Sequence, residues 1–413
     1  MIPMSKKYET ETPSYTMTTV MEEAARCLLC HDAPCSQACP AHTDPGKFIR
    51  SVRFRNVKGA AETIRENNAL GAICARVCPT EKYCELACSR TGIDSPIDIG
   101  GIQRYVTDFE QQAKMDILKK GDSNGKTIAI VGSGPAGLQT ATTMLERGYA
   151  VDIYEKSEKA GGYLTYGIPE YRLPQDIVDF EIKRIVNLGA DIHYNVTVGK
   201  DITMDDLKAN HDAVVVAVGA SEAKSLSIFA GNDYVESAVD FLARVKDAKG
   251  DITDVPQNAV VIGGGDVAMD VATTLKRLDA KNVTDVAYEE FDEFRASKKE
   301  LEGTRKAGVT IVDGYVPSAV DDNVVTFKHR KIDSELKIKA DKIILAIGQQ
   351  INADNLGINI ERGVVPYVGY KTEDPKVYIT GDIAKGDQTV VWAVRKGKKV
   401  ADLVDQTLLG GTK

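Results

Sequence analysis

The stretch TIAIVGSGPAG, residues 127–137, decides the fold of this 413-residue chain. Its first five residues predict a short buried strand, and a helical pattern over 135–147 follows at once. Glycine at the first, third and sixth positions of GSGPAG permits a tight turn, close backbone approach to a pyrophosphate and close helix–strand packing. Glu155 follows the next predicted strand, 150–154, at the spacing where a carboxylate accepts ribose hydroxyl groups. A glycine motif alone is a weak signal and could be a structural turn, but the complete unit predicts dinucleotide binding.

The same strand–glycine–helix–strand unit recurs at 259–288, with GGGDVA, residues 263–268, in its turn. Its second strand ends in Tyr288, Glu289 and Glu290, so neither Arg nor Lys stands there to pair with a 2′-phosphate. This pattern favours NADH over NADPH. Two alternatives stay open: a basic group could reach in from elsewhere, and the glutamates could be a solvated charge pair.

Apolar strand patterns at 213–218 and 342–347 alternate with helical ones, which indicates α/β architecture with largely parallel sheets. The last segment, 376–409, reads as a strand and a helix without a glycine motif, so we expect it to complete the first dinucleotide domain. We predict an N-terminal all-α domain followed by two nested Rossmann-like domains. The expected boundaries are 1–120 for the helical domain, 121–235 with 342–413 for an FAD domain, and 236–341 for an inserted NAD(P)H domain.

Two dinucleotide folds in one chain suggest two dinucleotides, most simply a flavin and a nicotinamide that exchange hydride. Gly381 and Asp382 precede a helix that begins near Thr389. An aspartate there could bond a ribityl hydroxyl of FAD, and the helix N-terminus would stabilise negative charge on the flavin pyrimidine ring. The alternative is that this Gly-Asp pair is only a turn.

All eight cysteines lie between Cys27 and Cys88. Their spacing is C-x2-C-x4-C-x3-C-P over 27–40 and C-x3-C-P-x4-C-x3-C over 74–88. Iron–sulfur clusters need thiolates held by short loops of this kind, whereas zinc more often takes paired C-x2-C knuckles. Disulfides are uncommon where thiols stay reduced. The pattern favours iron–sulfur clusters over zinc and over disulfides, and eight thiolates would suffice for two 4Fe–4S clusters.

The charge and hydropathy of the chain argue against two classes of function, nucleic-acid binding and membrane insertion. The net charge is −8, and the chain has no block of basic residues, which argues against nucleic acid as a partner. No apolar run reaches the roughly 18 residues of a membrane span, and the N-terminus lacks the apolar stretch of a signal peptide. We therefore expect a cytoplasmic protein without membrane contact. The five histidines form no cluster in the sequence, and no side chain is required as a catalytic acid or base.

At the level of longer motifs, the chain resembles the dihydropyrimidine dehydrogenase family. The resemblance rests on CLLCHDAPCSQACP (27–40), CARVCPTEKYCELACSR (74–90), SPIDIGGIQRYVTDFE (95–110), EKSEKAGGYLTYGIPEYRLP (155–174) and GDIAKGDQTVVWAV (381–394). It covers nearly the whole chain and is greatest for the FAD/NAD-binding iron–sulfur subunit of the bacterial two-subunit enzyme. The glutamate synthase small subunit shares the general plan, but NNALG (67–71) and SPIDIGGIQ fit the pyrimidine family better.

The resemblance implies a cluster assignment that the cysteine count does not. One 4Fe–4S cluster would take Cys27, Cys30, Cys35 and Cys88. The other would take Cys39, Cys78, Cys84 and, unusually, Gln103, which leaves Cys74 as a non-ligand. A neutral amide ligand in place of a thiolate should raise the potential of that cluster.

The resemblance also implies nucleotide contacts. Arg172 and Val198 would contact FAD, as would residues 155–164 and 381–390. Arg295 matches an arginine near the adenosine phosphate of NADPH, but Tyr288 stands where NADPH-using members have arginine, which supports NADH and leaves the role of Arg295 in doubt. The full candidate set for the cofactors is Gly132, Gly134, Pro135, Ala136, Gly137, Glu155, Lys156, Gly162, Leu164, Arg172, Val198, Gly381, Asp382, Thr389 and Val390 for FAD, with Gly263, Gly264, Gly265, Asp266, Val267, Ala268, Tyr288, Glu289, Arg295, Ala346, Ile347 and Gly348 for the nicotinamide nucleotide.

The function implied by the resemblance is electron input. NADH would be oxidised at FAD, and single electrons would pass through the clusters to an FMN-containing partner, in a heterotetramer, that reduces uracil or thymine at the 5,6 double bond. Alternatives are an NAD(P)H reductase like the glutamate synthase small subunit and a redox- or nucleotide-sensing module without turnover. A disulfide reductase is disfavoured because no cysteine follows Cys88.

Overall fold

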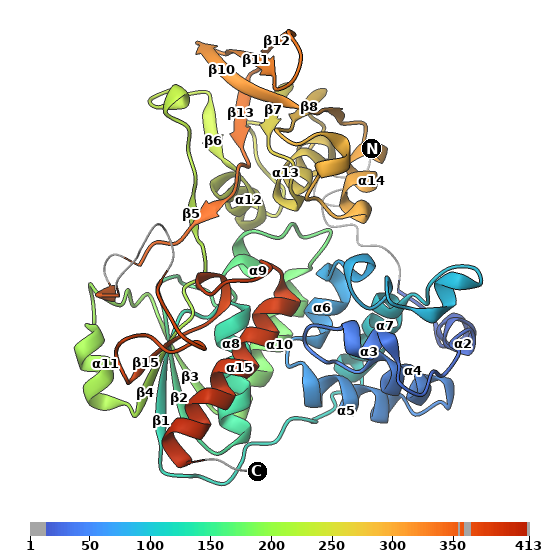
Figure 1. The fold of residues 1–413 in the computed structure, drawn as a ribbon, viewed down its shortest axis with the longest axis vertical. Helices are drawn as coiled ribbons and strands as arrows, with labels where there is room; N and C mark the ends of the chain where they lie inside the picture. The colour runs from blue at the N-terminus through green and yellow to red at the C-terminus, as the bar shows by residue number, and fades with distance from the viewer. Residues whose placement is uncertain (1–13, 354–355, 359–364, 411–413) are drawn as a thin grey trace. The chain divides into compact units, whose positions relative to one another are not determined.

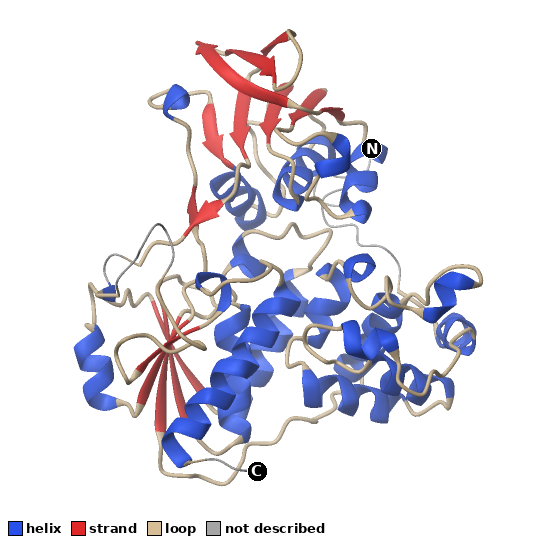
Figure 2. Cartoon of the chain, viewed as in Figure 1, coloured by secondary structure: helices blue, strands red, loops and turns tan. Residues whose placement is uncertain are grey.

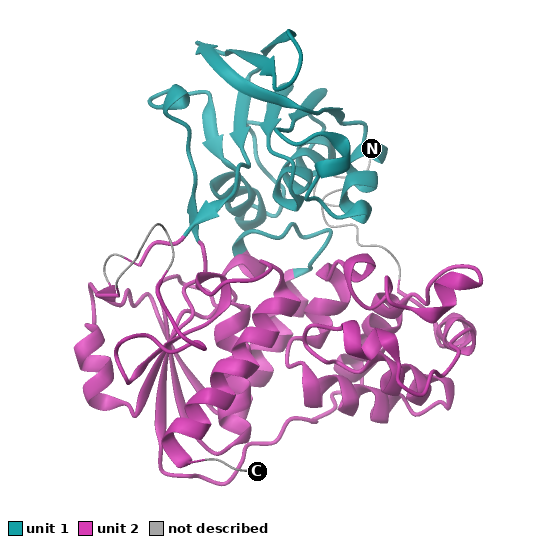
Figure 3. Ribbon diagram, in the orientation of Figure 1, with its two compact units in different colours: residues 1–12, 166–174, 221–350 teal, residues 13–165, 175–220, 351–413 magenta. Residues whose placement is uncertain are grey.

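The structure is a computed structural model that describes residues 14–353, 356–358 and 365–410. The chain forms two compact units (Figure 3). Unit 1 holds residues 166–174 and 221–350, and unit 2 holds the described residues of 14–165, 175–220 and 351–410. Each unit therefore combines segments that are distant in sequence.

The first part of unit 2 is a helical module built on the cysteine-rich segment (Figure 1). Apolar side chains at helical spacing, such as Phe48, Ile49, Val52 and Ile64, are buried together in its core. Its elements are α2 (Met17–Ala25), α3 (Pro34–Ala38), α4 (Pro45–Arg53), α5 (Val57–Asn67), α6 (Gly71–Val77), η1 (Thr80–Lys82), η2 (Ser89–Gly92) and α7 (Ile99–Gln112).

The second part of unit 2 is a five-stranded parallel sheet in the order β15-β4-β1-β2-β3. Its strands are β1 (Thr127–Val131), β2 (Ala150–Glu155), β3 (Ala190–Tyr194), β4 (Ala213–Val216) and β15 (Val377–Ile379). Its helices are α8 (Pro135–Glu146), α9 (Tyr163–Tyr166), α10 (Gln175–Leu188), α11 (Met204–Asn210) and α15 (Val390–Leu409), with the turn η6 (Gly381–Ile383) before α15. The C-terminal segment thus lies in the same sheet as the first glycine motif.

Helices α8 and α15 pack side by side over this sheet (Figures 1 and 2). Gly397 makes the close approach possible, because a Cβ atom there would lie 2.7 Å from the carbonyl oxygen of Ala136. The two helices begin near the same end of the sheet, since a Cβ atom on Gly381, just before α15, would lie 3.0 Å from the Cβ of Ala136 in the first turn of α8.

A buried ionic cluster joins the helical module to the sheet part of unit 2. Arg65 of α5 is fully buried and contacts Glu110 of α7 and Glu181 of α10, each at 2.8 Å. Arg184 adds a second cation 2.6 Å from Glu181. A backbone group also bonds across this junction, because the Ala72 N–H donates to the Glu181 carboxylate at 2.9 Å. Buried charges of this kind persist only when they are paired, so the cluster fixes the two parts to each other.

Unit 1 contains the second parallel sheet, in the order β6-β13-β7-β8-β9. Its strands are β6 (Val235–Ser237), β7 (Asn258–Ile262), β8 (Asn282–Val286), β9 (Thr310–Val312) and β13 (Lys342–Leu345), with helices α12 (Ala238–Asp247), α13 (Asp266–Arg277) and α14 (Lys298–Lys306). An antiparallel sheet follows β9, consisting of β10 (Tyr315–Asp321), β11 (Val324–His329) and β12 (Glu335–Lys339). Unit 1 also contains a two-stranded antiparallel sheet of β5 (Glu222–Ala223) and β14 (Gln349–Gln350), and the short 3-10 helices η3 (Ser227–Phe229) and η4 (Phe291–Glu293).

The predicted fold class is confirmed, because each glycine motif follows a strand of a parallel α/β sheet and the cysteine-rich segment is helical. The antiparallel sheet β10–β12 was not foreseen. Within the described residues, no helix combines the length and the apolar character that crossing a membrane would require.

Candidate functional site

The first glycine turn connects β1 to α8 in unit 2. Gly132 has a φ of +101°, and a Cβ atom there would lie 2.7 Å from the carbonyl oxygen of Ala217. A Cβ atom on Gly137 would lie 2.1 Å from Gly132 O, so this position must also be glycine. By contrast, nothing lies within 4 Å of a Cβ atom on Gly134. The backbone therefore faces open space at the N-terminus of α8, where free N–H groups favour a phosphate.

Glu155 lies at the end of β2, buried against this turn. Its Oε2 accepts from the Ser133 N–H at 3.0 Å and from the Ser133 hydroxyl group, and its Oε1 accepts from Ser157 N–H at 2.9 Å. A carboxylate offers about four acceptor positions, so these three bonds orient Glu155 without exhausting it. The arrangement fits a group that also receives ribose hydroxyls.

The other predicted FAD residues in unit 2 lie around this turn or in the core. A Cβ atom on Gly162 would lie 3.2 Å from Gly134 Cα, so the 155–164 loop covers the glycine turn. Leu164 and Val198 are buried, whereas Lys156 is exposed. Pro135 and Ala136 form the first turn of α8.

Gly381 and Asp382 approach the same turn from the C-terminal segment. Burial raises the pKa of the Asp382 carboxyl, while the Lys396 amine acts to lower it. Lys396 is fully buried, and its Nζ donates to Gly381 O at 3.1 Å and Ala384 O at 3.0 Å. Thr389 caps α15, whose first residue is Val390. The N-termini of α8 and α15, an open glycine backbone and the half-buried carboxyl of Asp382 fit the phosphates, polar ring and ribityl chain of a flavin dinucleotide.

Four cysteines surround a small cavity in the helical module. Cys27, Cys30, Cys35 and Cys88 all line it, although 53 positions separate the last two. None is in a disulfide. Burial, with the neighbouring Cys88 and Cys27 thiols, raises the pKa of Cys35 to about 11. Thiols crowded around a shared space without pairing are the donor set of an iron–sulfur cluster.

The remaining four cysteines form a second group. Burial is the main reason that the pKa of Cys78 is raised, and the thiols of Cys74, Cys84 and Cys39 follow as further causes. Burial also raises the pKa of Cys74 to about 12. The structure thus places Cys74 with the three predicted ligands, and does not separate it from them.

Gln103 is buried on α7, which packs against the Cys74-bearing helix α6. Its amide nitrogen donates to Gly71 O at 2.7 Å, which leaves the carbonyl end of the side chain as the possible ligand. The choice of Gln103 over Cys74 stays a prediction.

Tyr83 connects the second cysteine group to the segment that precedes α15. It lies next to Cys84, and its hydroxyl group donates to Asp387 Oδ2 at 2.9 Å. Lys398 of α15 makes a second connection by donating to Ala41 O at 3.0 Å and Asn67 O at 2.9 Å. Sequence reasoning missed both residues, and no local motif marks either of them.

The second glycine turn, in unit 1, connects β7 to α13. Gly263 has a φ of +155°, and a Cβ atom there would lie 2.3 Å from Ala346 O, just after β13. A Cβ atom on Gly264 would lie 2.6 Å from Glu289 Oε2, whereas one on Gly265 would meet nothing within 4 Å. The structure therefore brings Glu289 to the turn, the position from which a carboxylate can meet a nucleotide ribose.

The other predicted residues of this site surround the turn. Asp266 begins α13 and accepts from Ser297 N–H at 2.7 Å. Ala268 is fully buried, and Gly348 has a φ of +99°. Val267 lies in the first turn of α13, and Ala346 and Ile347 follow β13.

Two basic residues that the sequence analysis did not name, Arg330 and Lys331, reach this site beside Arg295, which it did name. The Arg330 guanidinium stacks on the Tyr288 ring at 3.9 Å. Lys331 lies 2.6 Å from Glu290, and Arg295 lies 3.5 Å from Glu289. Arg330 and Lys331 come from the connection between β11 and β12. The residues around β8 alone do not predict that Arg330 and Lys331 lie beside Tyr288 and Glu290.

Arg172 also belongs to unit 1. Its guanidinium pairs with Asp270 of α13 at 2.6 Å and with Glu300 of α14 at 3.1 Å. The predicted contact of Arg172 with FAD stays a prediction.

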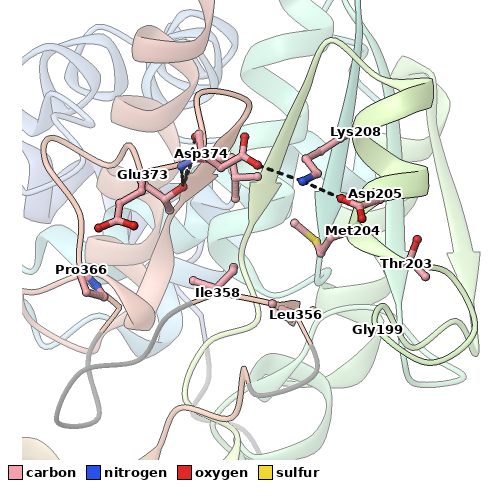
Figure 4. Close-up of a pocket in the computed structure, with 13 residues that line it drawn as sticks. Gly199, Thr203, Met204, Asp205, Lys208, Leu356, Ile358, Pro366, Glu373 and Asp374 are labelled. Atoms are coloured by element: carbon pink, nitrogen blue, oxygen red, sulfur yellow. Dashed lines mark hydrogen bonds and ion pairs between the residues drawn. The ribbon is translucent and has the colours of Figure 1, made fainter.

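A separate cavity of about 530 Å³ lies in unit 2, between α11 and the segments near Leu356 and Asp374 (Figure 4). Lys208 bridges Asp205 at 2.8 Å and Asp374 at 3.0 Å beside it. None of the described residues that line this cavity is a predicted cofactor residue.

Comparisons with known proteins identify the families that match the two parts of the chain. The family described as dihydropyrimidine dehydrogenase domain II, 4Fe-4S cluster, matches residues 4–115, and the pyridine nucleotide-disulphide oxidoreductase family matches residues 126–397. The NAD-dependent dihydropyrimidine dehydrogenase subunit PreT of Escherichia coli (strain K12) is 54% identical over 99% of both chains. The glutamate synthase [NADPH] small chain of the same organism is 28% identical over 92% of this chain and 89% of its own length.

Among solved structures, FprA of Mycobacterium tuberculosis in complex with NADPH has a TM-score of 0.59 at 18% identity, over 69% of this chain and 85% of FprA. This likeness concerns the fold alone. The chain is an oxidoreductase with a 4Fe–4S cluster domain, and it belongs to the family of NAD-dependent dihydropyrimidine dehydrogenase subunits.

Proposed function

We propose that this chain is the electron-input subunit of a dihydropyrimidine dehydrogenase. In this proposal it oxidises NADH and delivers electrons to an FMN-containing partner that reduces uracil or thymine to the 5,6-dihydropyrimidine. A bound flavin would convert two-electron hydride chemistry into one-electron steps, and two 4Fe–4S clusters would carry the single electrons.

The observation that carries the proposal is the connection between the two cofactor regions of unit 2. Tyr83, next to Cys84, bonds Asp387, which lies between Asp382 and the α15 N-cap Thr389. The second cysteine group therefore adjoins the segment that we assign to the flavin. This adjacency supports a path in which electrons pass from the flavin to the cluster of the second cysteine group first. They would then pass to the cluster held by Cys27, Cys30, Cys35 and Cys88.

Protein groups in unit 2 favour the reduced flavin. The N-terminus of α15 carries a partial positive charge, and Lys396 adds a buried amine behind the 381–387 segment. Both would favour negative charge on the flavin pyrimidine ring, while Asp382 would bond a ribityl hydroxyl group. No described side chain needs to donate or remove a substrate proton here, so we assign the catalytic acid to the partner.

The nucleotide preference is proposed from unit 1. Glu289 lies against Gly264, where a carboxylate would bond ribose hydroxyls and repel a 2′-phosphate. The nearby cations are paired with carboxylates. Both features support NADH.

The partner is proposed from the relatives, which are named as subunits of a dehydrogenase. We propose an FMN-containing iron–sulfur subunit in a heterotetramer. The glutamate synthase relative names another possible assembly, and experiment separates the two.

The test is to express the chain with a candidate FMN-containing partner subunit, purify the complex and measure uracil reduction with NADH. The expected result is dihydrouracil formed in proportion to the NADH consumed, with little activity on NADPH. A Cys84→Ser variant should retain flavin bleaching by NADH and lose uracil reduction. Co-purification with a glutamine amidotransferase, or tight NADH binding without flavin bleaching, would overturn the proposal.

A further inference from the structure

The environment of Glu289 in unit 1 contains three cations beside three carboxylates. Arg295 pairs with Glu289 at 3.5 Å, Arg330 with Glu293 at 3.0 Å and Lys331 with Glu290 at 2.6 Å. Glu289 is the residue that reaches the glycine turn, so this group surrounds the position of the adenosine ribose. Three cations at that position would ordinarily indicate a site for a 2′-phosphate.

The hairpin between β11 and β12 delivers two of the three cations. Arg330 N–H donates to Gly314 O at 2.8 Å, and Gly314 N–H donates to Glu289 O at 3.0 Å, so the hairpin is tied to the residue that follows Tyr288. The Arg330 guanidinium stacks on Tyr288 at 3.9 Å and donates to Tyr288 O at 2.9 Å. Arg330 is thus held by contacts that do not depend on its carboxylate partner.

Hydrogen bonds also hold Glu290 and Glu293, the two carboxylates that pair with Lys331 and Arg330. Glu290 and Glu293 cap the short turn η4 together, and Glu290 N–H donates to Glu293 Oε2 at 3.3 Å. The bond to Arg330 lowers the pKa of Glu293, and the bond to Glu290 raises the pKa of Lys331. Both pairs are therefore ionic at neutral pH.

We infer that Glu290 and Glu293 determine the nucleotide preference of this chain, because they engage Lys331 and Arg330 and add negative charge that repels a 2′-phosphate. This inference rests on the proposed function, specifically on the preference for NADH. Glu289 stays available for the ribose hydroxyls. Arg330 and Lys331 would then be a pair of phosphate-binding cations whose charge is cancelled by Glu293 and Glu290.

The test replaces both carboxylates with their amides, in the double variant Glu290→Gln/Glu293→Gln. Reduction of ferricyanide by the holoprotein gives kcat/KM for NADPH and NADH, and calorimetry gives the affinity of the oxidised protein for NADP+ and NAD+. We expect kcat/KM for NADPH and the NADP+ affinity to rise about tenfold or more, because two nearby negative charges are lost. The values for NADH and NAD+ should change by less than about threefold, since Glu289 is intact.

Two further variants identify the cause. Glu335→Gln removes one negative charge from β12, where the carboxylate pairs with Lys337. This variant should leave kcat/KM for NADPH and for NADH unchanged. Adding Arg330→Met and Lys331→Met to the double variant should abolish the gain with NADPH. An unchanged double variant, or a gain that survives loss of both cations, would overturn the inference. A wild-type protein that already prefers NADPH would instead refute the NADH preference in the proposed function.

Discussion

The Tyr83 hydroxyl group donates a hydrogen bond to Asp387 Oδ2 at 2.9 Å and so joins segments that are 304 positions apart. Tyr83 stands next to Cys84 of the second cysteine group, and Asp387 precedes the N-cap of α15. The hydrogen bond is therefore a direct polar connection from the cysteine group to the segment that we assign to the flavin.

Tyr83→Phe should slow electron transfer out of the flavin without affecting its reduction. The variant loses a hydrogen bond of about 1 kcal/mol, which corresponds to roughly fivefold in an equilibrium or a rate. Stopped-flow absorbance should show flavin bleaching by NADH at the wild-type rate and cluster reduction slowed about fivefold. Tyr105→Phe, which removes a hydroxyl group that donates to Met17 Sδ, is the matched control and should change neither step. Equal cluster reduction in the two variants would contradict the prediction.

The buried Arg65 cluster should dominate the stability of the junction in unit 2. Arg65→Ala leaves Glu110 and Glu181 without their main cation, and breaking a buried pair costs about 3–5 kcal/mol. Urea denaturation should show this loss in the free energy of unfolding. Lys58→Ala is the control, because its pair with Glu62 is exposed and should contribute less than about 1 kcal/mol. Similar losses in both variants would show that the cluster has no special role.

Local patterns predicted the two glycine turns well, because the strand, the turn and the helix are contiguous and the turn demands glycine. Gly132 and Gly263 both have positive φ angles and face carbonyl oxygens that would clash with a Cβ atom. The pairing of Tyr83 with Asp387, and of Arg330 with Tyr288, could not be predicted. These contacts join distant segments whose own sequences carry no periodic or motif signal, so only the folded chain reveals them.

Among the cysteines, some groupings could be predicted from local spacing and others could not. Spacing alone grouped Cys39 with Cys27, Cys30 and Cys35, since all four lie within 13 residues. Only the resemblance to a family added Cys88, and the structure brings it to the same cavity as Cys35. Gln103 is harder still, because a buried glutamine on a helix looks like any other until its surroundings are known.

Metal analysis should decide between Cys74 and Gln103. Cys74→Ala should leave iron and sulfide content at the wild-type level, because we predict that this thiol is not a ligand. Gln103→Ala should lower the iron content or alter the EPR signal of one cluster, and Cys84→Ala should do so more strongly. If Cys74→Ala lost iron while Gln103→Ala kept it, the second cluster would have four thiolate ligands.

Lys396→Met should weaken the binding of FAD while the protein stays folded. The Lys396 amine donates to Gly381 O at 3.1 Å and to Ala384 O at 3.0 Å, and it is fully buried, so these carbonyl groups have no water to replace it. Leaving buried acceptors unsatisfied costs about 1–3 kcal/mol. Part of this cost falls on the segment that carries Asp382, and FAD affinity should fall about tenfold, the equivalent of 1.4 kcal/mol.

The measurement is equilibrium dialysis of FAD from the purified holoprotein, with iron content recorded in the same samples. Lys399→Met is the matched control, because Lys399 is an exposed residue of the same helix and its loss should leave FAD affinity unchanged. Iron content should stay constant in both variants, since neither lysine contacts a cysteine-bearing loop in our assignment. If Lys396→Met retained FAD as tightly as Lys399→Met, the buried amine would not organise the flavin segment, and Asp382 with the α15 N-terminus would have to hold it alone.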